Sequence, residues 1–189
     1  MDDIIITSND DHLVSKIIRS LNAQFCLKDL GSLTYFLGIE VIPQGSGMHL
    51  SQAKYIKDVL GHTNMTDAKP CSTPADASSK LVRSGFLFAS PQLYRQTVGA
   101  LQYATISRQD ITFAVNRVRQ YMHSPTDEHW STVKRILRYL KGSIDSGLFL
   151  QPSSLHSLRA YSDAGWISDS DDCRSQYGFS IYLGSNLIS

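Results

Sequence analysis

The sequence has few features of membrane, secreted or metal-knuckle proteins. Its three cysteines, Cys26, Cys71 and Cys173, are odd in number and lack any C-x-x-C or Cys/His spacing, so we expect free thiols. No apolar run approaches the roughly 18 residues needed to cross a bilayer. The N-terminus carries acidic residues where a secretory signal carries basic ones. We therefore expect an intracellular protein, cytoplasmic or nuclear, with no membrane partner.

The composition is typical of a globular protein, and the charged residues are unevenly distributed along the chain. With 189 residues and 42% hydrophobic content, the chain fits one domain or two small ones. Residues 1–50 hold three basic and six acidic side chains, whereas residues 94–150 hold eight basic and four acidic ones. An excess of positive charge over residues 94–150 suits a nucleic-acid-binding surface. Solvated helices carry a similar excess equally often, and both alternatives stay open.

Two adjacent carboxylates, Asp2 and Asp3, stand directly before the apolar run Ile4-Ile5-Ile6. This pattern predicts a strand over residues 3–7 with the two acids at its start. Like charges this close repel each other unless a cation lies between them, which favours a divalent metal. The alternative is a solvated pair leading into an ordinary strand, because short motifs often match by accident.

The remainder of the first half predicts mixed secondary structure. A helix following Asn9-Asp10-Asp11 would have its apolar face at 3.6-residue spacing, and the dense apolar run 33–42 would pair with Met48-His49-Leu50 as a hairpin. Ser51 would cap a short helix that stops near Gly61. Residues 66–90, rich in proline and serine, predict an extended connector. The apolar face of the first helix comprises Leu13, Ile17, Leu21 and Phe25.

The second half begins with three predicted helices. The first runs from Pro91 to about Ser107, the second starts at Asp110 as its cap, and the third follows Ser124-Pro125. The third helix carries an apolar stripe typical of a core-facing helix and a basic face that could rest on a phosphate backbone. That basic face consists of Lys134, Arg138 and Lys141, with Arg135 beside it.

Residues from Gly147 onward predict strands, at 147–151, 158–163, 177–183 and 186–189. The acidic segment 169–174 between two of them lacks the spacing and glycine of an EF-hand, so a solvated turn is the better interpretation. Asp163 differs from these acids because it ends a strand that we expect to be central in its sheet. An unpaired carboxylate is unusual in such a place without a function.

In this order, the motifs resemble the Pol polyprotein of copia-type long-terminal-repeat retrotransposons, from the end of the reverse transcriptase into ribonuclease H. The resemblance covers essentially the whole chain. Met1-Asp2-Asp3 is similar to the Y-x-D-D polymerase signature, and 25–31 with 35–41 is similar to the strands around the primer grip. Further matching blocks are Leu50–Tyr55, Lys69–Pro74, Tyr94–Tyr103, Arg108–Ile111, Leu137–Gly142 and Ala160–Trp166.

The resemblance implies two-metal chemistry with Mg²⁺. Asp2 would be the nearer polymerase ligand with Asp3 a supporting charge, and Asp163 would be the first ribonuclease H ligand. The template-primer duplex would meet the primer-grip residues Phe36, Leu37 and Gly38 and the basic face Lys134, Arg135, Arg138 and Lys141. Gly165 and Ile167 depart from the usual Asp and small residue of the family; lost hydrolysis and a neutral change both remain open.

We accordingly expect an α+β fold with four parts. These are a palm and primer-grip remnant at 1–65, a connector at 66–90, a helical thumb or connection region at 91–145, and an incomplete ribonuclease H-like mixed sheet at 146–189. The resemblance places the remaining carboxylates of both metal sites outside these residues, so we expect the chain alone to be catalytically inactive. The alternatives are a non-catalytic nucleic-acid-binding module and a portion of a longer active Pol polyprotein.

Overall fold

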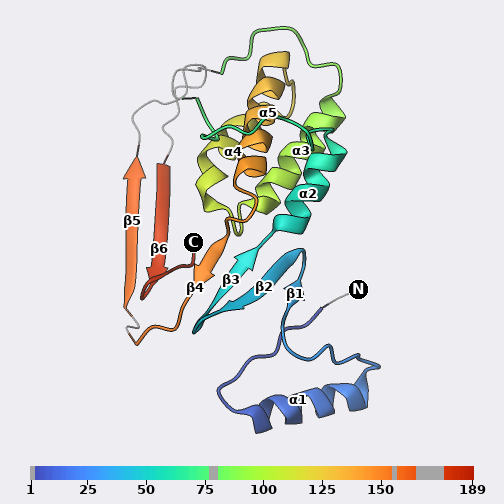
Figure 1. Cartoon of the computed structure of the whole chain (residues 1–189), viewed down its shortest axis with the longest axis vertical. Coiled ribbons are helices and arrows are strands. Elements are labelled where there is room, and N and C mark those ends of the chain that lie inside the picture. The colour runs from blue at the N-terminus through green and yellow to red at the C-terminus, as the bar shows by residue number, and fades with distance from the viewer. Residues whose placement is uncertain (1–2, 77–80, 155–156, 165–176) are drawn as a thin grey trace.

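The computed structural model describes residues 3–76, 81–154, 157–164 and 177–189 (Figure 1). The described chain is mixed α+β, with two antiparallel sheets, most helices gathered at one end and the N-terminal helix at the opposite end. The fold class is therefore confirmed at this level. In chain order the elements are α1 (Asp11–Gln24), β1 (Tyr35–Phe36), β2 (Ile39–Gln44), β3 (Gly47–Ser51), α2 (Ala53–His62), α3 (Pro91–Ala104), a 3₁₀ turn (Gln109–Ile111), α4 (Thr112–Arg119), α5 (Asp127–Gly142), β4 (Leu148–Leu150), β5 (Leu158–Ala164), β6 (Tyr177–Leu183) and β7 (Asn186–Leu187).

The hydrophobic core lies between α2, α3, α4 and α5. Each helix contributes apolar residues three or four positions apart, which places them on one face. The predicted stripe of α5 is confirmed, since Val133, Ile136, Leu137 and Leu140 are all fully buried and Trp130 is half-buried. Burying an aliphatic side chain contributes roughly 1.5–3 kcal/mol, so this helical core is the main source of stability.

The start of α5 is fixed by a reciprocal cap. The Thr126 hydroxyl accepts a hydrogen bond from the His129 backbone N–H, and the His129 ring accepts one from the Thr126 backbone N–H at 2.9 Å. Both side chains are buried. Because unpaired N–H groups at a buried helix start are costly, this pair stabilises the point where the chain enters α5.

The prediction that Asp110 caps α4 is wrong. The residue before α4 is Ile111, which makes no side-chain cap, and Asp110 lies within the preceding 3₁₀ turn. Its carboxylate instead accepts hydrogen bonds from Arg108 and Tyr139. A nearby guanidinium is a stronger donor than a backbone N–H, which accounts for the difference.

The first sheet has the order β1-β2-β3-β4, all antiparallel. The predicted hairpin at 33–50 is confirmed, but its first strand is divided by the turn Leu37-Gly38 into β1 and β2. β4 follows the helices and pairs with β3, so the sheet joins distant parts of the chain (Figure 1). A Cβ on Gly47 would lie 2.5 Å from the Leu150 carbonyl oxygen, and one on Gly147 would collide with the Leu50 carbonyl oxygen, so this pairing depends on both glycines.

The second sheet has the order β5-β6-β7. Within the described residues β5 pairs with β6 alone, so it is an edge strand, and Asp163 is exposed. The prediction that Asp163 ends a central strand is therefore wrong. Because the Asp163 carboxylate is exposed to water, it needs no metal ion or basic partner to offset its charge. The acidic segment 169–174 and both Gly165 and Ile167 lie outside the described residues.

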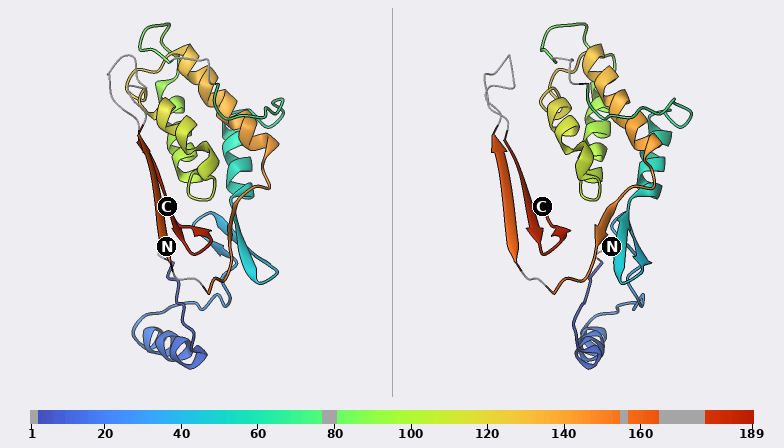
Figure 2. Two further views of the ribbon diagram at one scale, coloured as in Figure 1. Left: turned by 90° about the vertical axis from the view of Figure 1, so that its left-hand side faces the viewer. Right: turned by 60° about the vertical axis from the view of Figure 1, so that its left-hand side comes forward.

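The N-terminal part differs most from expectation. Residues 3–7 form no strand, because no other strand of the described chain lies alongside to pair with their backbone groups. Helix α1 forms as predicted, with Asp10 accepting from the N–H groups of His12 and Leu13. However, none of its residues is buried, and it lies apart from the helical core in both views of Figure 2.

The connector 66–90 contains no helix or strand in its described part, as predicted, yet it packs on the helices. Phe88 stacks on Trp130 with ring centroids 4.9 Å apart, and the Tyr121 hydroxyl donates to the Leu81 carbonyl. Cys26 and Cys71 are free thiols, as expected, while Cys173 lies outside the described residues. None of the described helices combines the length and apolar character that a membrane crossing requires.

Candidate nucleic-acid interface

The predicted metal ligands do not come together in the described structure. Asp2 lies outside the described residues, Asp3 is exposed before α1, and Asp163 is exposed on β5. Across the described segments no three His, Cys, Asp or Glu side chains lie close enough to hold a metal ion. The described residues therefore do not fit the two-metal sites that the resemblance implies, and no step through Mg²⁺ follows from them.

The predicted primer-grip residues form a tight turn. Phe36 of β1 pairs with Ile39 of β2, so Leu37 and Gly38 make a two-residue hairpin loop. Leu37 has φ 45° and Gly38 has φ 80°, and positive φ at both central residues is the mark of a type I′ turn. The Leu37 side chain is 57% exposed at the tip of this turn.

Two tyrosines from different helices lie behind the turn. The hydroxyl of Tyr103, near the end of α3, donates a hydrogen bond to the Leu37 carbonyl oxygen. Tyr55 of α2 meets Tyr103 edge to face with ring centroids 5.1 Å apart, and its own hydroxyl donates to the Ala100 carbonyl. Burial, together with the nearby Tyr103, raises the pKa of Tyr55 above its ordinary value, so the Tyr55 phenol is a neutral donor at neutral pH.

The basic face of α5 divides into two kinds of side chain. Arg138 donates to the Lys69 carbonyl at 2.6 Å, and Arg135 donates to the Thr73 hydroxyl at 2.8 Å and pairs with Asp76 at 3.6 Å. These guanidinium groups hold residues 69–76 of the connector against α5. Exposed pairs of this kind contribute modestly, but several of them together fix one segment.

Lys134 and Lys141 differ from the arginines. Both are half-buried on α5, and neither ammonium forms an ion pair within the described part of the chain. They are seven residues apart, two helical turns, and so project from the same side of the helix. Of the predicted basic face, these two lysines are the charges left available to a partner.

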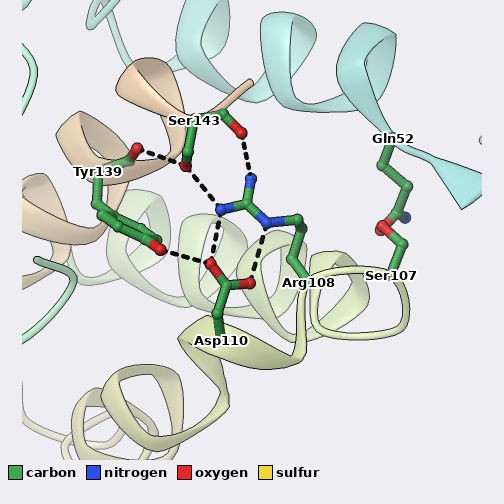
Figure 3. Close-up of polar contacts among 6 residues, drawn as sticks. All are labelled: Gln52, Ser107, Arg108, Asp110, Tyr139 and Ser143. Carbon is green, nitrogen blue, oxygen red and sulfur yellow. Dashed lines mark hydrogen bonds and ion pairs between the residues drawn. The ribbon is translucent and has the colours of Figure 1, made fainter. Parts of the chain in front are cut away.

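A polar cluster around Arg108, which sequence reasoning missed, joins four residues (Figure 3). Arg108 is 1% exposed, yet its guanidinium makes two hydrogen bonds to the Asp110 carboxylate and two to Ser143 at the end of α5, one to its carbonyl and one to its hydroxyl. Tyr139 donates to the same carboxylate at 2.7 Å. Burying a guanidinium is costly unless its donors are satisfied, and here the cluster satisfies them.

The hydrogen bonds and charges of this cluster shift the pKa of Asp110. Partial burial alone raises the pKa of Asp110, but the hydrogen bonds from Arg108 and Tyr139 and the positive charge of Arg108 outweigh it, so the pKa lies below its ordinary value. The hydrogen bond to Asp110, with some burial, raises the pKa of Tyr139. The cluster joins the 3₁₀ turn to the end of α5, and so sets where the chain leaves the helices toward β4.

A smaller buried contact lies near this cluster. The Ser107 hydroxyl donates to the side-chain oxygen of Gln52 at 2.7 Å, and both residues are buried. Gln52 directly precedes α2, so the contact fixes the position of α2 against the end of α3. Figure 3 shows Gln52 and Ser107 beside the Arg108 cluster but not bonded to it.

The amino-acid sequence of the chain matches those of known proteins. A sequence-family model described as "Reverse transcriptase (RNA-dependent DNA polymerase)" matches residues 1–77. The retrovirus-related Pol polyproteins from transposons RE2 and RE1 of Arabidopsis thaliana are each 48% identical to the chain over its whole length. The chain belongs to the retrotransposon Pol polyprotein family. The copia-type resemblance predicted from the motifs is thereby confirmed.

The extent of these matches differs between relatives. The chain spans 13% of each of the two Pol polyproteins. An uncharacterized mitochondrial protein of Arabidopsis thaliana is 41% identical over all of this chain and is covered over 79% of its own length. No solved structure matches the chain significantly. The chain thus corresponds to a small part of a whole Pol polyprotein.

Proposed function

We propose that this Pol chain helps to bind an RNA/DNA template-primer duplex and is catalytically inactive alone. The proposal rests on which basic side chains of α5 already have partners within the chain. Lys134 and Lys141 have no ion pair in the described chain, whereas Arg135 and Arg138 hold the connector in place. Two ammonium groups on one side of a well-packed helix suit contacts to phosphates. The turn at Phe36, Leu37 and Gly38 would be a second contact.

Duplex binding is tested by fluorescence anisotropy with a labelled RNA/DNA template-primer, measured at several salt concentrations. Each neutralised phosphate releases counterions, so affinity should fall steeply with salt. The double variant Lys134→Glu/Lys141→Glu should bind at least about tenfold more weakly, with a salt slope smaller by about 2. Lys16→Glu/Lys28→Glu, which changes the net charge equally at exposed sites near the N-terminus, is the matched control. Equal binding by both double variants would contradict the proposal.

The absence of turnover is tested separately, with primer-extension and hybrid-cleavage assays in Mg²⁺. We expect none from this chain, because the described residues gather no set of three potential metal ligands. Turnover that Asp2→Ala, Asp3→Ala or Asp163→Ala abolishes would overturn this part of the proposal. An intracellular location, cytoplasmic or nuclear, remains part of the same proposal.

A second candidate is a portion of a longer active Pol polyprotein, carrying out RNA-directed DNA synthesis and cleavage of hybrid RNA. The match of residues 1–77 to a reverse-transcriptase model and the 13% share of the polyproteins favour it. Sequencing the flanking DNA tests it. An open reading frame that encodes an upstream acidic palm strand in frame would support this candidate, and an in-frame stop would exclude it.

A further inference from the structure

The conformation of Leu37 is unusual for its residue type. In the described chain only Leu37 and Asn64 have positive φ without being glycine. Asparagine tolerates this region, whereas leucine is disfavoured there because its Cβ crowds the neighbouring carbonyl oxygen. Type I′ turns accordingly favour Asn and Gly at their central positions. Something outside the turn must therefore hold Leu37 in place.

Packing of the leucine side chain does not provide this support, because 57% of its surface is exposed. The support comes from behind the turn. The Tyr103 hydroxyl donates to the Leu37 carbonyl, and a Cβ on Gly38 would lie 3.5 Å from Cε1 of the same ring, in ordinary van der Waals contact. One tyrosine side chain thus bonds to Leu37 and lies where a side chain at position 38 would meet it.

The tyrosine is itself held by the helical core. Its ring meets Tyr55 edge to face, and Tyr103 is the last residue but one of α3, next to the buried Ala104. The Tyr55 hydroxyl binds within α3, at Ala100, and does not bond to the turn. The two tyrosines therefore form a platform, but only Tyr103 has a polar contact with the turn.

We propose that Tyr103 is a positioning residue that fixes the β1–β2 turn in its left-handed conformation and so sets how Leu37 is presented to nucleic acid. The second half of this statement rests on the duplex binding proposed above. Through Tyr103, the helical core that carries Lys134 and Lys141 controls the geometry of the other contact. Removing the hydroxyl leaves Leu37 free to relax.

The experiment compares Tyr103→Phe with Tyr55→Phe in the full 189-residue chain. Both variants remove one phenolic hydroxyl from the same platform. Amide hydrogen exchange of residues 36–41 should become about three- to tenfold faster in Tyr103→Phe, the range expected for one lost hydrogen bond. Its Kd for a template-primer duplex should rise by a similar factor. Tyr55→Phe should change each quantity by less than about twofold.

A rescue separates positioning from a general loss of stability. Glycine adopts positive φ without strain, so Leu37→Gly in the Tyr103→Phe background should return the exchange of residues 39–41 to within about twofold of the wild-type rate. A substitution that merely loosened the core would not be rescued by a change in the turn. Urea unfolding of each variant confirms that the exchange is measured on folded protein.

The possible outcomes test the positioning role of Tyr103, its link to nucleic-acid binding and the proposed function separately. Unchanged exchange in Tyr103→Phe would overturn the positioning role, including when affinity falls, since the hydroxyl would then act directly on the ligand. Faster exchange with unchanged affinity would overturn the link to nucleic acid. If the wild-type chain binds no duplex, the proposed function fails, whereas the exchange and rescue measurements still decide whether Tyr103 holds the turn.

Discussion

Arg108 and Asp110 form an ion pair in which the arginine side chain is 1% exposed and the aspartate side chain 39% exposed. The pair therefore lies at the boundary of the core, with its positive charge inside and its negative charge reaching water. Ser143 and Tyr139 of the α5 region complete the hydrogen bonds on either side (Figure 3). A chain that places a charge inside its core in this way depends on the partner of that charge.

Asp110→Asn should therefore lower the free energy of unfolding by about 2–3 kcal/mol. Removing one partner of a buried pair leaves the other charge uncompensated, and the aspartate's exposure keeps the loss below the largest known values. Urea denaturation measures the effect. Tyr139→Phe, which removes a single hydrogen bond to the same carboxylate, should cost about 1 kcal/mol. A cost for Asp110→Asn no larger than that of the exposed control Asp58→Asn would show that Ser143 alone satisfies Arg108.

The same pair predicts a dependence of stability on pH. The pKa of Asp110 in the folded state lies below its ordinary value of 3.8. Its contribution is therefore fully present above that ordinary value, and it is lost as the pH falls through 3.8 toward the lower folded-state pKa. The difference in unfolding free energy between wild type and Asp110→Asn should be constant from about pH 5 to 7 and shrink toward pH 3. A difference that stays constant to pH 3 would contradict this assignment.

The pairing of β3 with β4 predicts an asymmetry among glycines. Gly147→Ala should destabilise the chain by about 1–3 kcal/mol, because its Cβ would collide with the Leu50 carbonyl and push β4 from the sheet. Gly61→Ala in α2 is the matched control, since a Cβ there meets nothing within 4 Å. That substitution should stabilise by about 0.5–1 kcal/mol, because alanine favours the helix. Thermal unfolding distinguishes the two, and equal effects would show that β4 does not pair in solution.

The separation of α1 from the core predicts unequal costs for the same truncation. Ile136→Ala in α5 removes a fully buried side chain and should cost about 2–5 kcal/mol. Ile17→Ala in α1 removes one that is 36% exposed in a helix without buried residues, and should cost less than about 0.5 kcal/mol. Urea denaturation checks both. A cost above about 2 kcal/mol for Ile17→Ala would mean that α1 packs on the rest of the chain in solution.

The amino-acid pattern predicted the helices well because their determinants are local. The residues of the apolar stripe of α5 lie within a few positions of one another, as do the cap residues before α1, and both helices form where their period indicates. The apolar run Ile4-Ile5-Ile6 predicts a strand over residues 3–7 that does not form. A strand depends on a partner elsewhere in the chain, and composition does not indicate whether that partner is present.

The site residues show the same division between local and distant determinants. The spacing of Lys134 and Lys141 on one side of α5 follows from the helical period, and the sequence predicts it. The use of Arg135 and Arg138 by the connector does not follow, because their partners Thr73 and Lys69 are 62 and 69 positions away. Likewise, Arg108 stands in a motif shared with the family, but only the meeting of the 3₁₀ turn with Ser143 shows why it is buried.

The last prediction concerns those connector contacts. Arg138→Ala removes the hydrogen bond to the Lys69 carbonyl and should free residues 69–76 from α5. Limited proteolysis should then cut this segment several times faster than in wild type, because cleavage follows the population of the released state. Lys134→Ala, on the same helix but with no hydrogen bond or ion pair to the connector in the described chain, is the control and should leave the cleavage rate unchanged. If Arg138 also binds phosphate, the added duplex should compete with Lys69 for its guanidinium and accelerate cleavage of the wild-type chain. Cleavage slowed or unaffected by the duplex would assign Arg138 to the fold alone, and duplex binding on α5 would then depend on the two lysines.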